Sequence, residues 1–412
     1  MSTPPSSVRE IESLLGTKEY FTNHYPLYHR LRAECPVYWS EKLKCWLLTR
    51  YDDCLAALRD YRRLSNRDRM TVMMKPLGEE AGKRFQMVRR HFTQGVIFSD
   101  PPDHTRLRTL INKAFTPSTI EKERPRIQEI VEGLLDRLQD KGSMDLIRDF
   151  AFPLPNTIRS EILGLPLEDT EQLKSWADGV VALFGAGADE TRMERGQKSL
   201  SAIREYLSRL ISQRRVNPGE DLISTLISAR EQNDQLSDDE LLSTCSTLFT
   251  ASQETTTSLI GSGMLALLRH PDQLKKLKES PDLIATAVEE ILRYDGPLQR
   301  QLRAATEDFE VRGMPIAAGQ MVCPVLGAAN RDPEVFADPD ALDIARENNP
   351  HIGFGFGIHW CVGAPLARLE VQIAINALLR RIPDLELATG EIDRPEDYTV
   401  RSIKSLPVVF SC

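Results

Sequence analysis

The stretch "HIGFGFGIHWCVGAPLARLE", residues 351–370, places Cys361 behind three closely spaced glycines and directly ahead of a helical pattern. Apolar residues then recur at helical spacing, which predicts a helix behind the cysteine: Leu366, Leu369, Ile373 and Ala377. Free N–H groups and the dipole at the start of such a helix favour a thiolate. The glycines match neither a P-loop nor a dinucleotide-binding pattern, so a phosphate site is not expected. Cys361 can therefore be a metal ligand or a nucleophile, with His359 as the nearby candidate base.

Composition excludes several classes of function. The 412 residues are 41% apolar and 27% charged, as in a soluble globular protein with a sizeable core. The formal net charge of -8 argues against a nucleic-acid partner. No apolar run reaches the roughly 18 residues of a membrane span, so no membrane partner is expected. The seven cysteines include no C-x-x-C pair, and no export signal is apparent, so a reduced, cytoplasmic protein is expected.

The hydrophobic pattern is mostly helical. Apolar residues recur at three- and four-residue spacing over residues 120–142 and 195–219. Strand-like stretches are fewer and lie toward the two ends of the chain, at residues 36–50, 309–325 and 400–410. The expected fold class is mainly α with small β-sheets, and one domain is expected over residues 1–412.

The clearest helix is predicted from residue 238 to residue 269. Ser237 and Glu240 form a capping box at its start, and the step from His270 to Pro271 ends it. Its interior, residues 248–263, contains small and β-branched side chains instead of better helix formers. One face would carry Leu248, Ala251, Ser252 and Thr255, with Glu254 turned about 100° away. Either something bulky lies against this helix, or its threonines bond back to their own backbone.

Two further pairs carry little information alone. Glu290 and Arg293 lie three residues apart on a helix, which by itself indicates a surface ion pair. Glu254 beside Thr255 places a carboxylate next to a hydroxyl, a pair that can relay protons.

In this order and spacing, the features resemble one family, the haem-thiolate monooxygenases or cytochromes P450 of the soluble bacterial type. The family's cysteine loop is matched by Phe354, Gly357, His359, Cys361 and Gly363. Its E-x-x-R pair is matched by Glu290 and Arg293. Its oxygen-binding helix motif is matched by Ala251, Glu254 and Thr255, with Ser252 in place of the usual glycine. The resemblance runs from residues 100–115 to the C-terminal segment and implies the cytochrome P450 fold, with the long helix crossing the haem.

The resemblance implies haem b with Cys361 as its axial iron ligand. Phe354 would shield the sulfur, while Gly357 and Gly363 would let the backbone approach the porphyrin. The haem-binding residues that it implies are His104, Arg108, Ala251, Arg303, Phe354, Gly357, His359 and Gly363. Glu290 and Arg293 become a buried structural pair, and His359 becomes a propionate ligand instead of a base.

The implied reaction inserts one oxygen atom from O2 into a hydrophobic small molecule, by hydroxylation or epoxidation. Thr255 would hold the oxygen substrate or its water, and Glu254 would deliver protons. Secondary metabolites, terpenoids, steroids and fatty acids are the expected substrate classes. A haem-thiolate sensor without turnover is the alternative, although it has no need of proton delivery. A cysteine hydrolase is disfavoured because no Cys/His/Asn triad is apparent.

The resemblance also implies partners and a substrate pocket. Electrons would come from a separate ferredoxin or flavodoxin-type protein, with NAD(P)H as the indirect source, and the chain is expected to be a monomer. Lys113 and Arg368 are candidate contacts for this donor or solvated charges. The candidate pocket residues are Phe85, Met87, Val88, Val181, Leu183, Phe184, Leu248, Ala251, Leu298, Gln299 and Ile403. A basic cluster is expected to meet a substrate carboxylate or carrier phosphate, or to be a solvated face: Lys83, Arg84, Arg89, Arg90 and His91.

Overall fold

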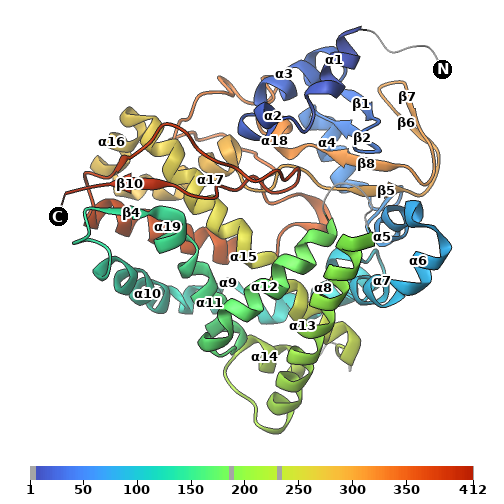
Figure 1. Cartoon of the computed structure of the whole chain (residues 1–412), viewed down its shortest axis with the longest axis horizontal. Coiled ribbons are helices and arrows are strands. Elements are labelled where there is room, and N and C mark those ends of the chain that lie inside the picture. The colour runs from blue at the N-terminus through green and yellow to red at the C-terminus, as the bar shows by residue number, and fades with distance from the viewer. Residues whose placement is uncertain (1–5, 185–189, 230–233, 412) are drawn as a thin grey trace.

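The computed structural model describes residues 6–184, 190–229 and 234–411 and is mainly helical with small sheets, as predicted (Figure 1). The helices are α1 Ser6–Leu14, α2 Lys18–Thr22, α3 Tyr25–Glu34, α4 Tyr51–Arg59, α5 Arg67–Met74, α6 Gly78–Arg84, α7 Gln86–Thr93, α8 Asp103–Ala114, α9 Pro117–Lys122, α10 Arg124–Asp136, α11 Pro153–Leu163, α12 Thr170–Val181, α13 Glu190–Val216, α14 Leu222–Ser228, α15 Asp238–Arg269, α16 Pro271–Glu279, α17 Ile284–Asp295, α18 Leu326–Ala329 and α19 Ala364–Arg381. The strands are β1 Val37–Ser40, β2 Cys45–Leu48, β3 Leu64–Ser65, β4 Ser143–Asp145, β5 Arg303–Ala305, β6 Phe309–Val311, β7 Met314–Ile316, β8 Met321–Pro324, β9 Glu386–Leu387 and β10 Pro407–Val409.

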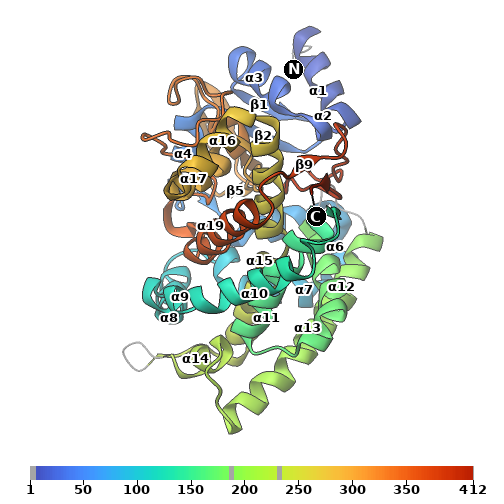
Figure 2. The ribbon, with the colours of Figure 1, turned by 90° about the vertical axis from the view of Figure 1, so that its left-hand side faces the viewer.

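Helix α15 runs through the middle of the molecule in both ribbon views (Figures 1 and 2). Its bounds are those predicted, because Ser237 and Glu240 form the complete capping box and His270 is the C-cap residue. Its 32 residues give it a length of roughly 48 Å. The helix packs against α11, α17 and α19, so residues placed on it can face several parts of the fold.

The two halves of α15 belong to two different hydrophobic clusters. Leu259, Ile260 and Met264 pack with residues of α10, α11, α17 and α19. In the first half, Leu241, Cys245 and Phe249 pack with residues of α5 to α8 and α12 to α14. Residues 250–256, in the middle of the segment with small side chains, lie between these clusters, and there the helix borders a cavity instead of a packed core.

The largest sheet has the strand order β1-β2-β8-β5-β3 and lies beside α1 to α4 (Figure 1). β2 and β8 are parallel, and the other neighbours are antiparallel. Arg303, the first residue of β5, is opposite Val322 of β8, so the sheet fixes the position of this arginine. Smaller sheets are β4-β10-β9 and the hairpin β6-β7.

The other predicted elements differ from the structure at their boundaries. Residues 120–142 belong to the end of α9 and to α10, because Pro125 lies at the start of a new helix. α13 ends at Val216, two residues before Pro218. Only residues 407–409 of the stretch 400–410 form a strand.

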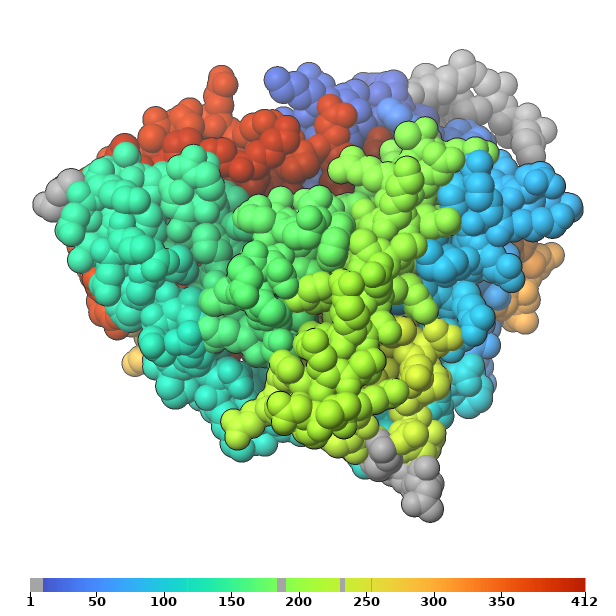
Figure 3. Space-filling model, turned by 60° about the horizontal axis from the view of Figure 1, so that its bottom comes forward, coloured from blue at the N-terminus to red at the C-terminus, as the bar shows by residue number. Residues whose placement is uncertain are grey.

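Helices α10 to α14 cover one face of the molecule, as the teal to yellow-green surface in Figure 3 shows. Among the described residues, no helix combines the length and the apolar character that crossing a membrane requires.

Candidate functional site

A cavity of about 750 Å³ lies against the middle of α15. Its other walls come from α8, the segment after α17 and the cysteine loop, residues 353–363. This size falls within the roughly 300–1,000 Å³ of ligand-binding pockets. Cys361, Thr255 and Glu254 all line this one cavity, although they are far apart in the sequence.

The cysteine loop depends on its glycines. Gly355 and Gly357 have φ values of +74° and +72°, a conformation that side chains with a Cβ rarely adopt. A Cβ on Gly357 would also lie 2.8 Å from the carbonyl oxygen of Leu58. The Cys361 N–H donates to the Phe354 carbonyl at 3.1 Å, and α19 begins three residues after the cysteine. The loop thereby holds Cys361 at the cavity wall.

Burial is the largest influence on the Cys361 thiol, and it raises the pKa. The N–H groups of Gly363 and Ala364, together with Arg108, act in the opposite direction. The start of α19 favours the thiolate, as the sequence indicated, but its effect on the pKa of Cys361 is smaller than that of burial. A thiol in this position ionises when it coordinates a metal cation, because coordination requires the thiolate.

Four residues form a basic corner of the cavity: Arg108, Arg303 and His359 line it, and His104 lies outside the lining, against His359. His104 and Arg108 lie one turn apart on α8, and the ring of His104 contacts that of His359, with 4.3 Å between centroids. Arg303 joins them from β5. A fifth residue, Arg69 of α5, also lines the cavity, and its charge acts on His359. We use "basic corner" for these five residues.

The histidines of the basic corner are neutral. Burial, followed by the charge of Arg108, lowers the pKa of His104 to about 4. Burial, followed by the charge of Arg303, lowers the pKa of His359 to about 2. Both ring nitrogens of His104 and Nε2 of His359 are buried without a hydrogen-bond partner among the described residues. The corner thus offers donors and positive charge to an anion.

The middle of α15 supplies hydroxyl groups beside the cavity. The Thr255 hydroxyl donates to the Ala251 carbonyl at 3.0 Å, and the Ser252 hydroxyl donates to the Leu248 carbonyl at 2.9 Å. All four residues also line the cavity. The hydroxyls thus bond back to their own helix, as one alternative from the sequence has it, and the cavity leaves room for the bulky group of the other alternative. The lone pairs of the Thr255 oxygen remain available as acceptors.

Glu254 lies beside Thr255 on the cavity wall. Burial is the main cause that raises the pKa of its carboxyl group, and the Ser402 side chain acts in the opposite direction. The carboxylates of Asp397 and Asp178 raise this pKa further. These neighbours increase the protonated fraction of Glu254, which suits a proton donor.

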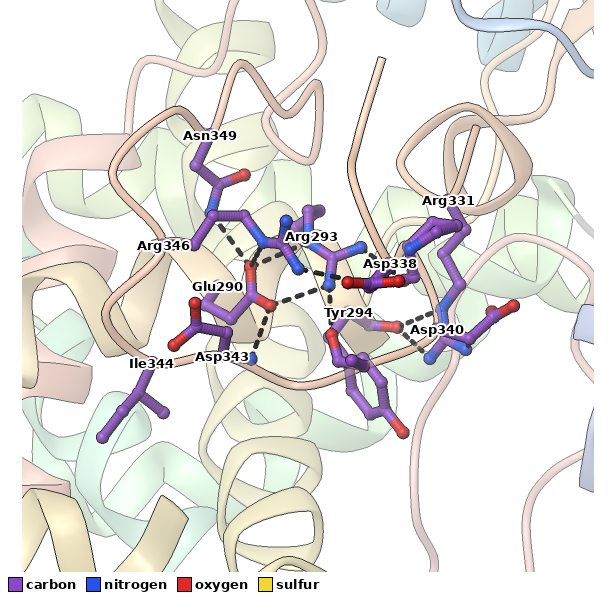
Figure 4. Close-up of polar contacts among 12 residues, drawn as sticks. Glu290, Arg293, Tyr294, Arg331, Asp338, Asp340, Asp343, Ile344, Arg346 and Asn349 are labelled. Carbon is purple, nitrogen blue, oxygen red and sulfur yellow. Dashed lines mark hydrogen bonds and ion pairs between the residues drawn. The ribbon is translucent and has the colours of Figure 1, made fainter. Parts of the chain in front are cut away.

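Glu290 and Arg293 form a buried network around the long segment that precedes the cysteine loop (Figure 4). Both side chains are 0% exposed, and they pair through two contacts of 2.7 and 2.8 Å. The guanidinium group also donates to the carbonyls of Asn330, Pro339 and Ala341. The Glu290 carboxylate accepts from the Asp343 N–H and from the side chains of Arg346 and Asn349. The pair thus ties residues 330–349 to α17.

The pocket residues expected from the sequence divide into two groups. Val181, Leu248, Ala251 and Leu298 line the cavity. The structure corrects five others, which lie in or against the hydrophobic core: Phe85, Met87, Val88, Leu183 and Ile403. Gln299 is also outside the cavity lining, and its side chain donates to the Gly296 carbonyl at 2.7 Å. The side chain of Phe184 lies outside the described residues.

Helical periodicity explains why the residues around position 85 lie in the hydrophobic core and not on the cavity wall. Phe85, Val88 and Phe92 share the face of α7 that packs into the core. Only Phe92, at the end of that face, reaches the cavity, together with Val96 and Phe98 from the following segment. The sequence analysis missed these three. The i, i+3, i+7 spacing marks Phe85, Val88 and Phe92 as one buried face, but no sequence signal separates Phe92 from the core residues.

The sequence analysis also missed charged residues that line the cavity: Arg69, Arg159, Asp178, Arg300, Glu370 and Asp397. Arg69 belongs to the basic corner, and no local pattern marks it. Glu370 of α19 is 4% exposed, and burial raises its pKa to about 8, so it is largely neutral near pH 7.

The basic cluster of residues 83–91 is largely paired. Arg84 forms ion pairs with Glu190 and Glu194, and Arg90 pairs with Asp239 at 2.9 Å. His91 is buried, and burial lowers its pKa to about 3. Lys83 and Arg89 are exposed and form no ion pair among the described residues, so the cluster is weakened as an anion site.

The candidate electron-donor contacts also differ from each other. Arg368 makes a bidentate ion pair with Glu289, at 2.6 and 2.7 Å, and its guanidinium lies 4.6 Å from the centre of the Phe354 ring. Arg368 therefore also fixes Phe354 beside the cysteine loop. Lys113 is exposed on α8.

Comparison with known proteins gives a consistent result. The family model described as "Cytochrome P450" matches residues 64–397. The "Biotin biosynthesis cytochrome P450" of Bacillus subtilis is 43% identical over 402 residues, which cover 97% of this chain and 99% of that protein. The crystal structure of P450BioI in complex with hexadec-9Z-enoic acid ligated acyl carrier protein superimposes with a TM-score of 0.89, at 42% identity, and covers 96% of this chain and 99% of that one. Myxobacterial CYP267B1 in complex with myristic acid has a TM-score of 0.88 and 41% identity, with 97% and 99% covered.

Proposed function

This chain belongs to the cytochrome P450 family and is a monooxygenase, and on that premise we propose that it inserts one oxygen atom from O2 into a hydrophobic small molecule by hydroxylation or epoxidation. The observation that carries the proposal is the single cavity on which Cys361, the basic corner and the pair Glu254–Thr255 converge. Each of these supplies one requirement of the reaction: a metal ligand, an anchor for a charged cofactor and a route for protons.

The family implies a haem-thiolate cofactor, and the residues around the cavity fit it. Unpartnered buried nitrogens of His104 and His359 suit the carboxylates of the haem propionates. A Cβ on Gly363 would meet only the sulfur of Cys361, at 3.9 Å, so the space beside the sulfur is open. We propose Cys361 as the iron ligand, with His104, Arg108, Arg303 and His359 at the propionates. Gly357, Phe354 and Ala251 would complete the haem contacts.

When bound, haem supplies the iron at which O2 is reduced and from which one oxygen atom passes to the substrate. The balanced reaction consumes the substrate, O2, two electrons and two protons, and it yields the oxygenated product and water. The chain's own task is to move those protons. We propose that the Glu254 carboxyl group gives a proton to the Thr255 oxygen or its water, while the Thr255 hydroxyl passes one on toward the oxygen substrate.

The substrate is proposed to be mainly apolar. Away from the basic corner, the described cavity wall carries apolar side chains. Val181 comes from α12 and Leu248 from α15, while Leu298 follows α17 and Val400 belongs to the C-terminal segment. Two similar structures contain a fatty acyl chain or a fatty acid. A long acyl chain is therefore the substrate class with the most direct support, ahead of terpenoids, steroids and other secondary metabolites.

We propose that the electrons come from a separate ferredoxin or flavodoxin-type protein, which receives them in turn from NAD(P)H. Lys113, exposed on α8, and Arg368, which also pairs with Glu289, are the candidate contacts for it. A carrier-bound acyl chain is the second form in which the substrate can arrive, as in the P450BioI complex. Lys83 and Arg89 are then the exposed charges available to the carrier.

The proposal is tested by turnover with isotope-labelled O2. The protein, a ferredoxin, its reductase and NADPH are incubated with myristic acid, an acyl chain on acyl carrier protein, a steroid, a terpenoid and a macrolide. Mass spectrometry should find one labelled oxygen atom in the product of at least one substrate, with acyl chains the best. A sensor would instead bind these molecules and show no labelled product with any of them.

A further inference from the structure

We infer that Arg69 binds a propionate carboxylate of the haem and completes the charge balance of the basic corner. This inference rests on the haem-containing function proposed above. It adds a residue from α5, a helix that neither the sequence motifs nor the resemblance connected with the cofactor.

Arg69 is placed by contacts that leave part of its guanidinium group unused. Its Nη1 donates to the Leu302 carbonyl at 3.2 Å, directly beside Arg303 in the sequence. The guanidinium carbon lies 4.2 Å from the centre of the Phe98 ring, and this cation–π contact orients the group. Its Nε is buried without a hydrogen-bond partner among the described residues. The side chain lines the cavity, and its other terminal nitrogen, Nη2, makes no hydrogen bond among the described residues.

The charges of the basic corner do not balance within the protein. Among the described residues, no carboxylate forms an ion pair with Arg69, Arg108 or Arg303. Asp100 is the acid whose charge acts on His104 and Arg303, and it already accepts from the Ser65 hydroxyl and from the N–H of Asn66.

The three arginines and the carboxylate of Asp100 give the corner a formal charge of plus two, and the histidines add no negative charge. Buried charge of one sign is costly unless an opposite charge compensates it. The two propionates of haem carry a charge of minus two and would balance the corner. Without Arg69 the corner would carry only one net positive charge for two carboxylates.

A substrate carboxylate is the competing anion for Arg69, because Phe98, on which Arg69 stacks, is also a cavity wall residue. The position of Arg69 favours the propionate. Nη1 of Arg69 and Nη1 of Arg303 donate to the same carbonyl, that of Leu302, at 3.2 and 2.9 Å. Arg303 is among the proposed propionate ligands, so Arg69 is placed at the same edge of the cofactor.

The test compares haem loss from the ferric holoenzymes of wild type and Arg69→Gln, with excess apomyoglobin as the haem acceptor. A charge-assisted hydrogen bond contributes about 1.5–3 kcal/mol, so the variant should lose haem roughly 10- to 100-fold faster. Arg67→Gln is the matched control. Arg67 lies on the same helix but is exposed and paired with Asp103, so its replacement should leave the rate unchanged.

Arg69→Lys separates charge from geometry. A lysine keeps the charge but cannot match the arginine contact, so its rate should lie between those of wild type and the glutamine variant. The propionate bands in the resonance Raman spectrum should shift in both variants. If Arg69→Gln does not fold, the lysine variant carries the test through these bands, and an unshifted spectrum overturns the inference.

An unchanged rate of haem loss in Arg69→Gln would contradict the inference while leaving the proposed function intact. If this variant also bound myristic acid more weakly but a neutral steroid equally well, Arg69 would be assigned to the substrate carboxylate. A wild-type protein that binds no haem would instead refute the proposed function.

Discussion

Replacing Arg293 by methionine is expected to lower the free energy of unfolding by about 3–5 kcal/mol, because it leaves the buried Glu290 carboxylate without its partner. The carbonyls of Asn330, Pro339 and Ala341 lose their donor at the same time. Residues 330–349 would then no longer be held against α17, and the cysteine loop follows directly. Chemical denaturation of the haem-bound proteins, monitored by circular dichroism, measures the change.

The matched control is Arg209→Met on α13. Arg209 pairs with Glu205 at 3.1 Å, but the side chains are 64% and 72% exposed. Loss of such a pair is expected to cost less than about 1 kcal/mol. If Arg293→Met were no more destabilising than this control, the buried pair would not hold the segment.

The second large effect is expected from Thr255→Ala. Removing the hydroxyl interrupts the proposed proton route from Glu254, so electrons consumed with O2 should be released as peroxide instead of appearing in product. General acid–base groups contribute about 10²–10⁴-fold, and a water molecule can replace part of the hydroxyl's function. Product formed per NADPH is therefore expected to fall about 10- to 100-fold. The measurement combines NADPH consumption, peroxide release and product yield.

Thr250→Ala is the control for this prediction. Thr250 also lines the cavity, and its hydroxyl makes the same kind of bond to the carbonyl four residues earlier, at 2.9 Å. Its replacement should leave the ratio of product to NADPH unchanged, and Thr255→Ser should retain most of the coupling. Full coupling in Thr255→Ala would remove this hydroxyl from the proton route.

The parts of the fold that the sequence predicted well are those with local signals. The ends of α15 follow from the capping box at Ser237 and from the His270–Pro271 step, and both signals are contained within a few residues. The cysteine loop is equally local, since Gly357 needs a positive φ and has no room for a Cβ. Such features are readable because the chain's own stereochemistry imposes them.

The pocket was harder to predict because it depends on which face of a helix points inward. Phe85 and Val88 are apolar and close in sequence to the cavity, but their helix turns them into the core. Arg69 was missed for a related reason. Its environment is made by Phe98, Leu302 and Arg303, which lie far from it along the chain.

The burial of Glu290 and Arg293 shows the same limit. A spacing of three residues on a helix predicts that Glu290 and Arg293 pair, but not whether the pair is buried. The segment 330–349 covers the pair and bonds to it. Only the resemblance to the family indicated a buried pair.

The central claim is that Cys361 binds the iron of a haem as a thiolate. The most direct test is the absorption spectrum of the reduced, carbon-monoxide-bound protein, recorded for wild type and for Cys361→His. We predict the strongly red-shifted Soret band of thiolate ligation in wild type and its loss in the variant. A wild-type spectrum without that band, or an identical band in Cys361→His, would contradict the assignment.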